Sequence, residues 1–214
     1  CLSSFAFGQN SGYLSSDDSD PKAIEFLEKV KKDFESYEAH KFNFTIDMEF
    51  PGHEGEKVEG HLIQSGDKFL LDMDERKIIS DNTSVWVYLK ARNEVQINDA
   101  DFDEASEVMK PSDLFRLYSS GNYVFAVTQY LQEAGEDVAQ IECKPLEEES
   151  EYSKMRITLA TKTSEIKRMK IFYKDGSRIT MNVESQEKGF ATDKNTFKFV
   201  AADYEGVMVE DLRF

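Results

Sequence analysis

Polar and apolar residues alternate along the chain from about residue 41. Between residues 42 and 50, Phe42, Phe44, Ile46 and Met48 recur at every second position, with polar residues between them. This period of two is typical of a β-strand with one buried face. Further strands are predicted at 57–64, 68–73, 76–80, 84–89, 93–98, 122–130, 137–144, 153–160, 166–174, 177–184 and 195–200. The short polar or glycine-containing links between them favour an antiparallel meander.

Two segments show a helical pattern instead. The first is predicted to begin at Asp20-Pro21, an N-cap side chain followed by proline at the first helical position. Its apolar stripe has helical spacing and consists of Ile24, Leu27, Val30 and Phe34. The second is predicted near residues 111–121, where Gly121 is placed to end it. Its apolar side is formed by Leu114, Phe115, Leu117 and Tyr118.

The predicted strands present one apolar and one polar face. In the run 153–160, for example, Met155, Ile157 and Leu159 alternate with polar or basic residues. Two helices cannot cover so large an apolar face, so the sheet must curl around them. A curled sheet can enclose an apolar cavity, but the side chains of small barrels normally fill their interior. The pattern alone therefore fits both a packed core and an open apolar pocket.

The charge balance of the chain argues against two classes of binding partner. Lys plus Arg is 26 and Asp plus Glu is 42, which gives a net charge of −16. Phosphate binding needs a basic surface, so this charge argues against nucleic acid as a partner. It also argues against docking on an anionic membrane surface. We expect no transmembrane segment, because no run of about 18 apolar residues is present.

Recognisable catalytic and metal-binding motifs are missing. His40, His53 and His61 are not at ligand spacing, and no convergent acid–base pair can be named. We therefore expect a protein that is not an enzyme and that uses no cofactor and no metal.

The first residues resemble the end of an export leader. Residues 1–8 contain an apolar stretch and small residues suited to cleavage before Gln9. The alternative is that Cys1 is the lipidated first residue of a lipoprotein, and both interpretations place the protein outside the cytoplasm. We expect residues 1–19 to be a leader remnant and linker, and residues 20–214 to form a single domain. Cys143 lies in a predicted strand and is expected to be a buried thiol.

Several segments in series resemble the LolA family of outer-membrane lipoprotein carriers. The similar segments keep family order from about residue 20 to residue 210. They are Ile78–Tyr88, Glu94–Ile97, Pro111–Phe115, Ile141–Pro145, Met169–Thr180, Asn195–Phe199 and Gly206–Val209. The resemblance implies a mainly β fold with some α: an incomplete, half-open antiparallel β-barrel of about 11 strands, covered by helices on its concave face.

The same resemblance implies a function. It predicts a monomeric periplasmic chaperone that binds the acyl chains of lipoproteins. The implied partners are acylated lipoproteins, an inner-membrane ABC-type releasing complex and an outer-membrane acceptor. Two alternatives stay open: an acceptor or sensor of the same fold, and a secreted binding module for another lipid.

The strand pattern then gives candidate residues for the acyl site. The apolar positions expected to contact lipid are Phe42, Phe44, Ile46, Met48, Met155, Ile157, Met169, Ile171, Met181, Phe197 and Phe199. The helices expected to act as a lid carry Ile24, Leu27, Leu114, Phe115 and Leu117. Many family members have an arginine after the strand that here ends near Gln64, where it holds the lid closed. This sequence has Ser65-Gly66-Asp67 instead, so the resemblance does not extend to that contact.

Overall fold

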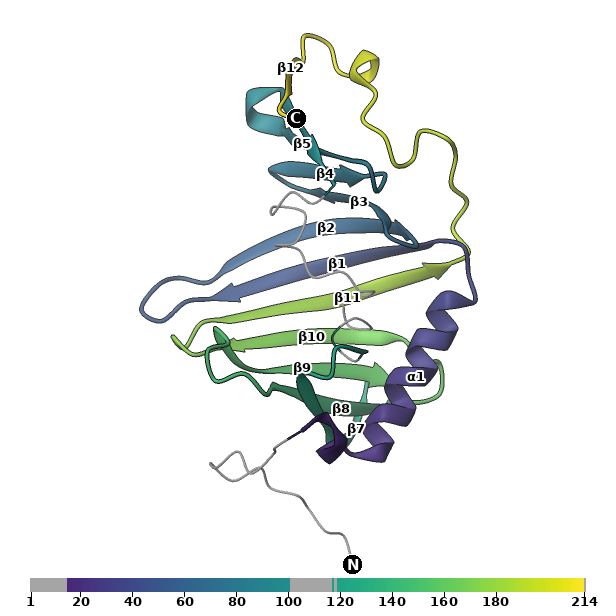
Figure 1. Ribbon diagram of the computed structural model, residues 1–214, viewed down its shortest axis with the longest axis vertical. Helices are drawn as coiled ribbons and strands as arrows, with labels where there is room; N and C mark the ends of the chain where they lie inside the picture. The colour runs from purple at the N-terminus through teal and green to yellow at the C-terminus, as the bar shows by residue number, and fades with distance from the viewer. Residues whose placement is uncertain (1–14, 101–116, 118, 214) are drawn as a thin grey trace, which may run out of the picture. The chain divides into compact units, whose positions relative to one another are not determined.

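The computed structural model describes residues 15–100, 117 and 119–213 (Figure 1). Strands form most of this part of the chain. In chain order, the elements are η1 Ser16–Asp18, α1 Pro21–Glu35, β1 His40–Glu49, β2 Glu56–Ser65, β3 Lys68–Met73, β4 Arg76–Ser80, β5 Ser84–Leu89, η2 Lys90–Arg92, β6 Glu94–Asp99, β7 Tyr123–Glu133, β8 Glu136–Pro145, β9 Tyr152–Ala160, β10 Ile166–Tyr173, β11 Arg178–Lys188, η4 Ala201–Asp203 and β12 Met208–Asp211.

The strands belong to one sheet with the order β12-β6-β5-β4-β3-β2-β1-β11-β10-β9-β8-β7. β12 pairs in parallel with β6, and every other ladder with a described register is antiparallel. The order has two ends, β12 and β7, so the described strands do not close into a barrel. The prediction of a mainly β protein with an open antiparallel sheet is confirmed.

Two details differ from the sequence prediction, and one predicted element is only partly described. The run 195–200 was expected to be a strand, but residues 194–197 form turns, and the alternation of Phe197 and Phe199 has another cause, given below. β12 was not predicted. Of the second helix, residues 114 and 115 lie outside the described residues, whereas Leu117 is helical and half-buried. Gly121 has φ +73°, a left-handed conformation that suits a residue following a helix.

The chain divides into two compact units. One contains Cys1–Glu35, Ile46–Lys57 and Asp113–Val183, and the other contains Ser36–Thr45, Val58–Ser112 and Glu184–Phe214. We call them the first and the second unit. Each has its own set of buried apolar side chains, and each carries part of the predicted site.

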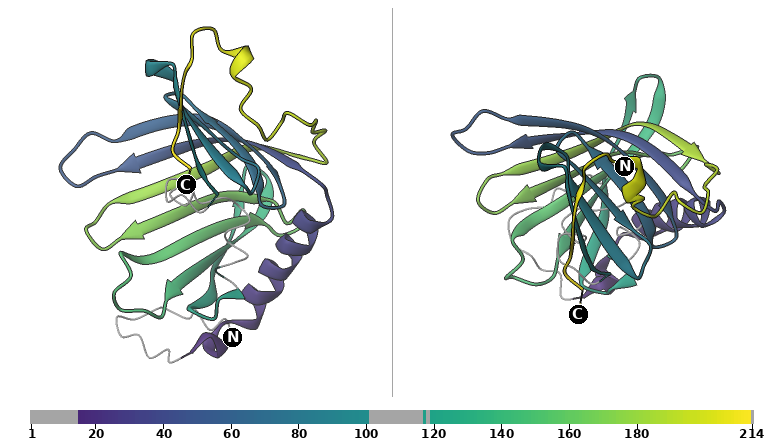
Figure 2. Two further views of the ribbon diagram at one scale, coloured as in Figure 1. Left: turned by 45° about the horizontal axis from the view of Figure 1, so that its top comes forward. Right: turned by 90° about the horizontal axis from the view of Figure 1, so that it is seen from above.

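Helix α1 begins where the sequence predicts. The Asp20 carboxylate accepts a hydrogen bond from the Lys22 amide at 2.8 Å, which is N-cap geometry. Buried residues on the helix are Ala23, Leu27 and Val30, while Ile24 is half-buried. Figures 1 and 2 show α1 beside β7 and β8 within the first unit.

The second unit buries its own row of apolar side chains. Leu62, Leu71, Ile78 and Val87 are opposite one another on β2–β5 and are all at most 3% exposed. Phe44 contributes to the same face, because a Cβ atom built on Gly60 would lie 2.9 Å from its ring. The Phe44 ring therefore occupies the space that the missing Gly60 side chain leaves.

Candidate functional site

The strongest candidate for a functional surface is the apolar face of the sheet in the first unit. Two rows of apolar side chains cross five neighbouring strands there. One row contains Val127, Ile141, Ile157, Met169 and Met181. The other contains Phe125, Cys143, Met155, Ile171 and Ile179. The register thus brings five of the predicted acyl-contact residues together: Met155, Ile157, Met169, Ile171 and Met181.

Burial along these rows falls from one side to the other. Ile141 and Ile157 are completely buried on β8 and β9, and Met169 on β10 is 3% exposed. Ile171, Ile179 and Met181, on β10 and β11, are only half-buried. Ile46 and Met48 of β1 are half-buried as well. They belong to the same face, because Asn182 on the opposite face donates a hydrogen bond to Asp47.

We call Ile46, Met48, Ile171, Ile179 and Met181 the apolar patch. The sequence pattern predicted four of these residues as lipid contacts. The prediction did not include Ile179, although the alternation of apolar and polar residues in 177–184 places Ile179 on the same face as Met181. Apolar side chains that stay half-buried beside a fully packed region provide surface that an apolar ligand can cover.

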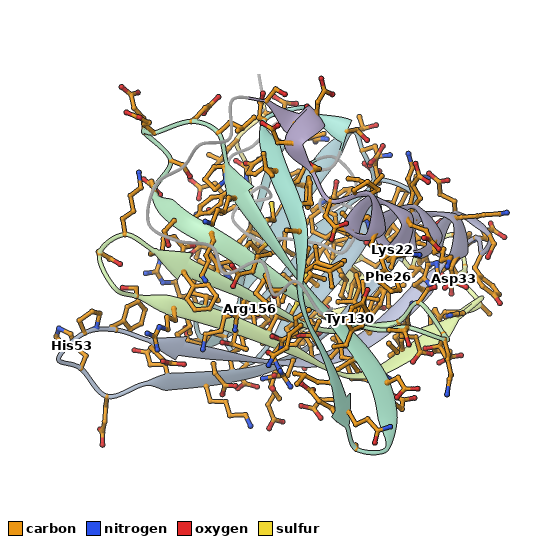
Figure 3. The ribbon with its side chains drawn as sticks, turned by 90° about the horizontal axis from the view of Figure 1, so that it is seen from below. Lys22, Phe26, Asp33, His53, Tyr130 and Arg156 are labelled. Atoms are coloured by element: carbon orange, nitrogen blue, oxygen red, sulfur yellow. The ribbon has the colours of Figure 1, made fainter. Side chains whose placement is uncertain are left out.

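Helix α1 covers the same face near the other ends of the strands. Phe26 of α1 lies 6.3 Å from Tyr130, measured between ring centroids. Tyr130 is opposite Ala139, which is itself opposite Leu159, so its ring extends the apolar face. Figure 3 shows Phe26, Tyr130 and Lys22 gathered at the helix. These rings border an open groove of about 500 Å³, which Leu131, Val138 and Thr161 also line.

A group of tyrosines lies at one end of the face. The hydroxyls of Tyr123 and Tyr152 are 2.7 Å apart, and the Tyr152 ring meets Tyr173 edge-on at 6.5 Å. Burial raises the pKa of Tyr152, and the hydrogen bond with Tyr123 raises it further. These side chains combine apolar rings with polar hydroxyls, which suits the boundary between an apolar ligand and its polar part. Sequence reasoning did not find this group, because its members come from three separate strands.

The predicted aromatic residues of the second unit are placed differently. Phe42 and Phe44 are buried at 2% and 4% exposure, and Phe42 stacks on the buried His40. Phe199 stacks on Tyr204 at a centroid distance of 4.5 Å and packs against Tyr88 in a tilted arrangement at 5.4 Å. Tyr88 points to the opposite face of β5 from Val87, so Phe199 does not lie on the row that contains Val87.

Contacts made by Tyr204 explain how the chain after residue 195 is held although the predicted strand 195–200 does not form. Lys77 donates a hydrogen bond to the Tyr204 hydroxyl at 3.0 Å and holds this segment on β4 and β5. Phe197 is buried at 8% exposure without belonging to a strand. Phe199 is thus held by aromatic contacts rather than by a ladder of backbone hydrogen bonds.

The predicted lid residues are only partly described. Ile24 and Leu27 lie on α1, and Leu117 is half-buried; Leu114 and Phe115 lie outside the described residues. Next to the turn where the family arginine is missing, Gln64 of β2 is fully buried and donates a hydrogen bond to the Gly66 carbonyl at 3.1 Å. The β2–β3 turn is therefore stabilised locally in this chain.

The opposite face of the same strands is charged. Glu142 is 4% exposed and accepts hydrogen bonds from Lys154 at 2.7 Å and from Arg156 at 2.5 Å. Burial raises the pKa of Glu142, but these two bonds outweigh it and the pKa lies below the usual 4.5. Cys143, its neighbour on the apolar face, is fully buried, and burial raises the pKa of its thiol. The prediction of a buried thiol is confirmed.

The described residues hold no group of three or more His, Cys, Asp or Glu side chains that could bind a metal. His53 lies at the tip of the β1–β2 hairpin (Figure 3). Within residues 15–100, 117 and 119–213, no helix has the length and apolar character needed to cross a membrane.

Comparison with known proteins identifies the family. The family model described as outer membrane lipoprotein carrier protein LolA matches residues 51–200, which is most of the chain. This protein belongs to the LolA family. The match covers every strand from β2 to β11, so it includes most of the residues that form the apolar face. None of the curated proteins matches this LolA-family sequence.

Solved structures agree on the fold. An uncharacterized conserved protein from Thermus thermophilus has a TM-score of 0.60 at 10% identity, with 90% of this chain and 99% of that one covered. A DUF1329 family protein from Desulfovibrio piger has a TM-score of 0.50 at 11% identity, covering 87% of this chain and 100% of that one. The lipoprotein LppX from Mycobacterium tuberculosis has a TM-score of 0.50 at 10% identity, covering 82% and 100%. At these identities the likeness concerns the fold alone.

Proposed function

We propose that this LolA-family protein is a periplasmic carrier that binds the acyl chains of lipoproteins on the apolar face of its first unit. The observation that carries the proposal is the apolar patch. Ile171, Ile179 and Met181 stay half-buried, although they continue rows that are fully buried on β8 and β9, and Ile46 and Met48 lie half-buried on the neighbouring strand β1. An acyl chain laid along this patch would complete the burial of Ile171 and Met181.

The carrier works by binding and release, without a catalytic step. Burying one methylene group stabilises a complex by about 0.8 kcal/mol, so transferring a lipid anchor with about 45 methylenes involves about 36 kcal/mol. Non-covalent binding reaches at most about 18 to 21 kcal/mol. Extraction from a membrane therefore needs an energy source, and an ABC-type releasing complex in the inner membrane would supply it. Transfer to an outer-membrane acceptor can then run downhill.

The proposed acyl site can be tested with two variants of β10 that introduce the same charge on opposite faces of the sheet. Ile171 and Phe172 are adjacent, apolar and half-buried, and they point to opposite faces. Ile171→Asp places a charge in the apolar patch, whereas Phe172→Asp places the same charge on the polar face. Ile171→Asp should weaken binding of a fluorescent fatty-acid probe at least about ten-fold, because a bound hydrocarbon chain would displace water from the carboxylate, which costs free energy. Phe172→Asp should bind the probe like the unmodified protein.

Thermal melts of both variants establish that they fold. Ile157 is a poorer choice for the test, because it is fully buried and a charge there would unfold the protein. A folded Ile171→Asp variant that binds the probe with unchanged affinity would contradict the proposed site. Native mass spectrometry of the protein purified from its own periplasm would show whether lipoproteins accompany it.

A further inference from the structure

The polar face of β9–β11 gathers positive charge in a chain whose net charge is −16. Phe172 is at its centre. On the neighbouring strands it is opposite Lys154 and Arg178. The cationic groups of Lys154, Arg156, Lys170 and Arg178 lie 5.1, 5.3, 5.6 and 5.9 Å from the centre of its ring. We call these five residues the Phe172 cluster.

Positive charge is in excess within this cluster. Glu142 pairs with Lys154 and Arg156, and Glu49 pairs with Lys170 at 3.3 Å and with Arg178 at 3.7 Å. Four cations thus share two carboxylates. Lys144 is close enough to Lys154 for the two charges to repel: burial lowers the pKa of Lys144, Glu142 partly offsets this effect, and Lys154 lowers the pKa further. The Arg178 side chain is 52% exposed, so the surplus charge reaches solvent.

We propose that the Phe172 cluster is a docking surface for an acidic segment of a partner protein. Carboxylates of the partner would form ion pairs with Lys170 and Arg178, which share Glu49 within this chain. Apolar atoms of the partner would lie against the half-buried Phe172 ring. A ring surrounded by basic side chains on a sheet is suited to an extended chain with alternating acidic and apolar residues. Adjacent strands are about 4.8 Å apart, so the three strands offer a strip about 10 Å wide, which matches one polypeptide segment.

The surroundings favour a protein segment over a membrane. The loop after β8 carries Glu147, Glu148 and Glu149, and Lys174 donates a hydrogen bond to the Glu148 carbonyl. Lys174 and Asp175 form the turn between β10 and β11, so this acidic loop lies at the end of the strands where the cluster is found. A flat anionic bilayer would meet the acidic loop together with the cluster and be repelled, whereas a narrow segment can contact the cluster alone.

This site is independent of acyl binding, because the Phe172 cluster and the apolar patch point to opposite faces of the same strands. The proposal therefore extends the carrier function by giving the protein a second surface, through which an acidic partner can bind while the apolar face is occupied. Electrostatic attraction of this kind accelerates encounter and selects partners.

The test measures binding of a fluorescein-labelled ten-residue polyglutamate peptide to the full chain, with a neutral Gly/Ser peptide of equal length for comparison. Lys170→Gln/Arg178→Gln removes two cations that share Glu49. The matched control, Lys22→Gln/Lys29→Gln, removes two cations of α1 that share Glu25 at 2.7 and 2.9 Å. Both double variants change the net charge equally.

We expect the polyglutamate peptide to bind saturably and more weakly at high salt. The Lys170→Gln/Arg178→Gln variant should bind it about three- to ten-fold more weakly, and the α1 control should bind it unchanged. Equal affinities for both double variants would overturn the proposal, as would failure of the unmodified protein to bind. Phosphatidylglycerol vesicles that bind through the Phe172 cluster more tightly than the peptide would also overturn it, in favour of a membrane.

The two β10 variants keep this proposal separate from the carrier function. Phe172→Asp should lose the polyglutamate peptide and retain the fatty-acid probe, and Ile171→Asp should do the reverse. A Phe172→Asp variant that retains the peptide refutes the docking surface and leaves acyl binding untouched. An Ile171→Asp variant that retains the probe refutes the acyl site and leaves the docking surface untouched.

Discussion

The carboxylate of Asp20 joins helix α1 to the free edge of the sheet, and its removal gives the most direct test of how the apolar face is covered. One carboxylate oxygen accepts from the Lys22 amide at 2.8 Å and caps the helix. The other accepts from the Val127 amide at 3.2 Å. The Asp20 amide donates to the Phe125 carbonyl at 2.8 Å. Because β7 ends the sheet, these bonds satisfy backbone groups that no strand pairs with.

The expected loss follows from these two side-chain bonds. Removing an N-cap costs about 1 kcal/mol. Leaving the partly buried Val127 amide without its acceptor costs about 1 kcal/mol more. Asp20→Ala should therefore lower the free energy of unfolding by about 2 kcal/mol, or the melting temperature by about 4–8 °C. In Asp20→Asn only one side-chain oxygen can accept, so this variant should lose about half as much.

Circular dichroism melts measure the loss, and hydrogen exchange locates it. The Val127 amide should exchange faster in Asp20→Ala, which removes its acceptor. Asp17→Ala serves as the control, because it removes an exposed carboxylate from the same segment. If Asp20→Ala melted like the unmodified protein, or if the Val127 amide kept its protection, the role assigned to Asp20 would be wrong.

Three further predictions concern buried groups. Glu142→Gln should be about 1–2 kcal/mol less stable at pH 7 in urea unfolding. Because the pKa of Glu142 is lowered in the folded protein, its carboxylate stabilises the fold above pH 4.5 and loses this effect as the pH falls further. An undiminished difference in unfolding free energy between Glu142→Gln and the unmodified protein at pH 3 would contradict the pairing. Gly60→Ala should cost about 1–3 kcal/mol in the same assay, because its Cβ would collide with the Asp72 carbonyl and the Phe44 ring, and Phe44→Leu should relieve only the part due to the ring. Cys143 should resist a thiol reagent in the folded protein and react in urea; rapid reaction without urea would refute its burial.

Much of the fold follows from local pattern. Short apolar runs bounded by turn signals located β3, β4 and β5 at their observed bounds, because strand ends and turns are set by neighbouring residues. The start of α1 could be predicted from Asp20 and Pro21, since capping involves only neighbouring residues. Its buried stripe is rotated slightly: Ala23 is buried and Ile24 only half-buried, because the helix orientation depends on the strands it packs against.

Other features depend on residues far apart in the sequence. β12 is short and exposed, and only its parallel pairing with β6 makes it a strand. Phe197 and Phe199 alternate like a strand, yet the ring contacts of Phe199 with Tyr88 and Tyr204 involve partners that no local pattern reveals.

The sequence by itself determined most of the strands, which face of most of them is apolar, and which family the chain resembles. Only the tertiary structure decided how deeply each apolar residue is buried, and so separated the half-buried Ile171 and Met181 from the packed Ile157. It also assembled four basic side chains around Phe172 from three different strands. The physical reason is that alternation is set by the local backbone, whereas burial and charge clustering are set by strand order and register.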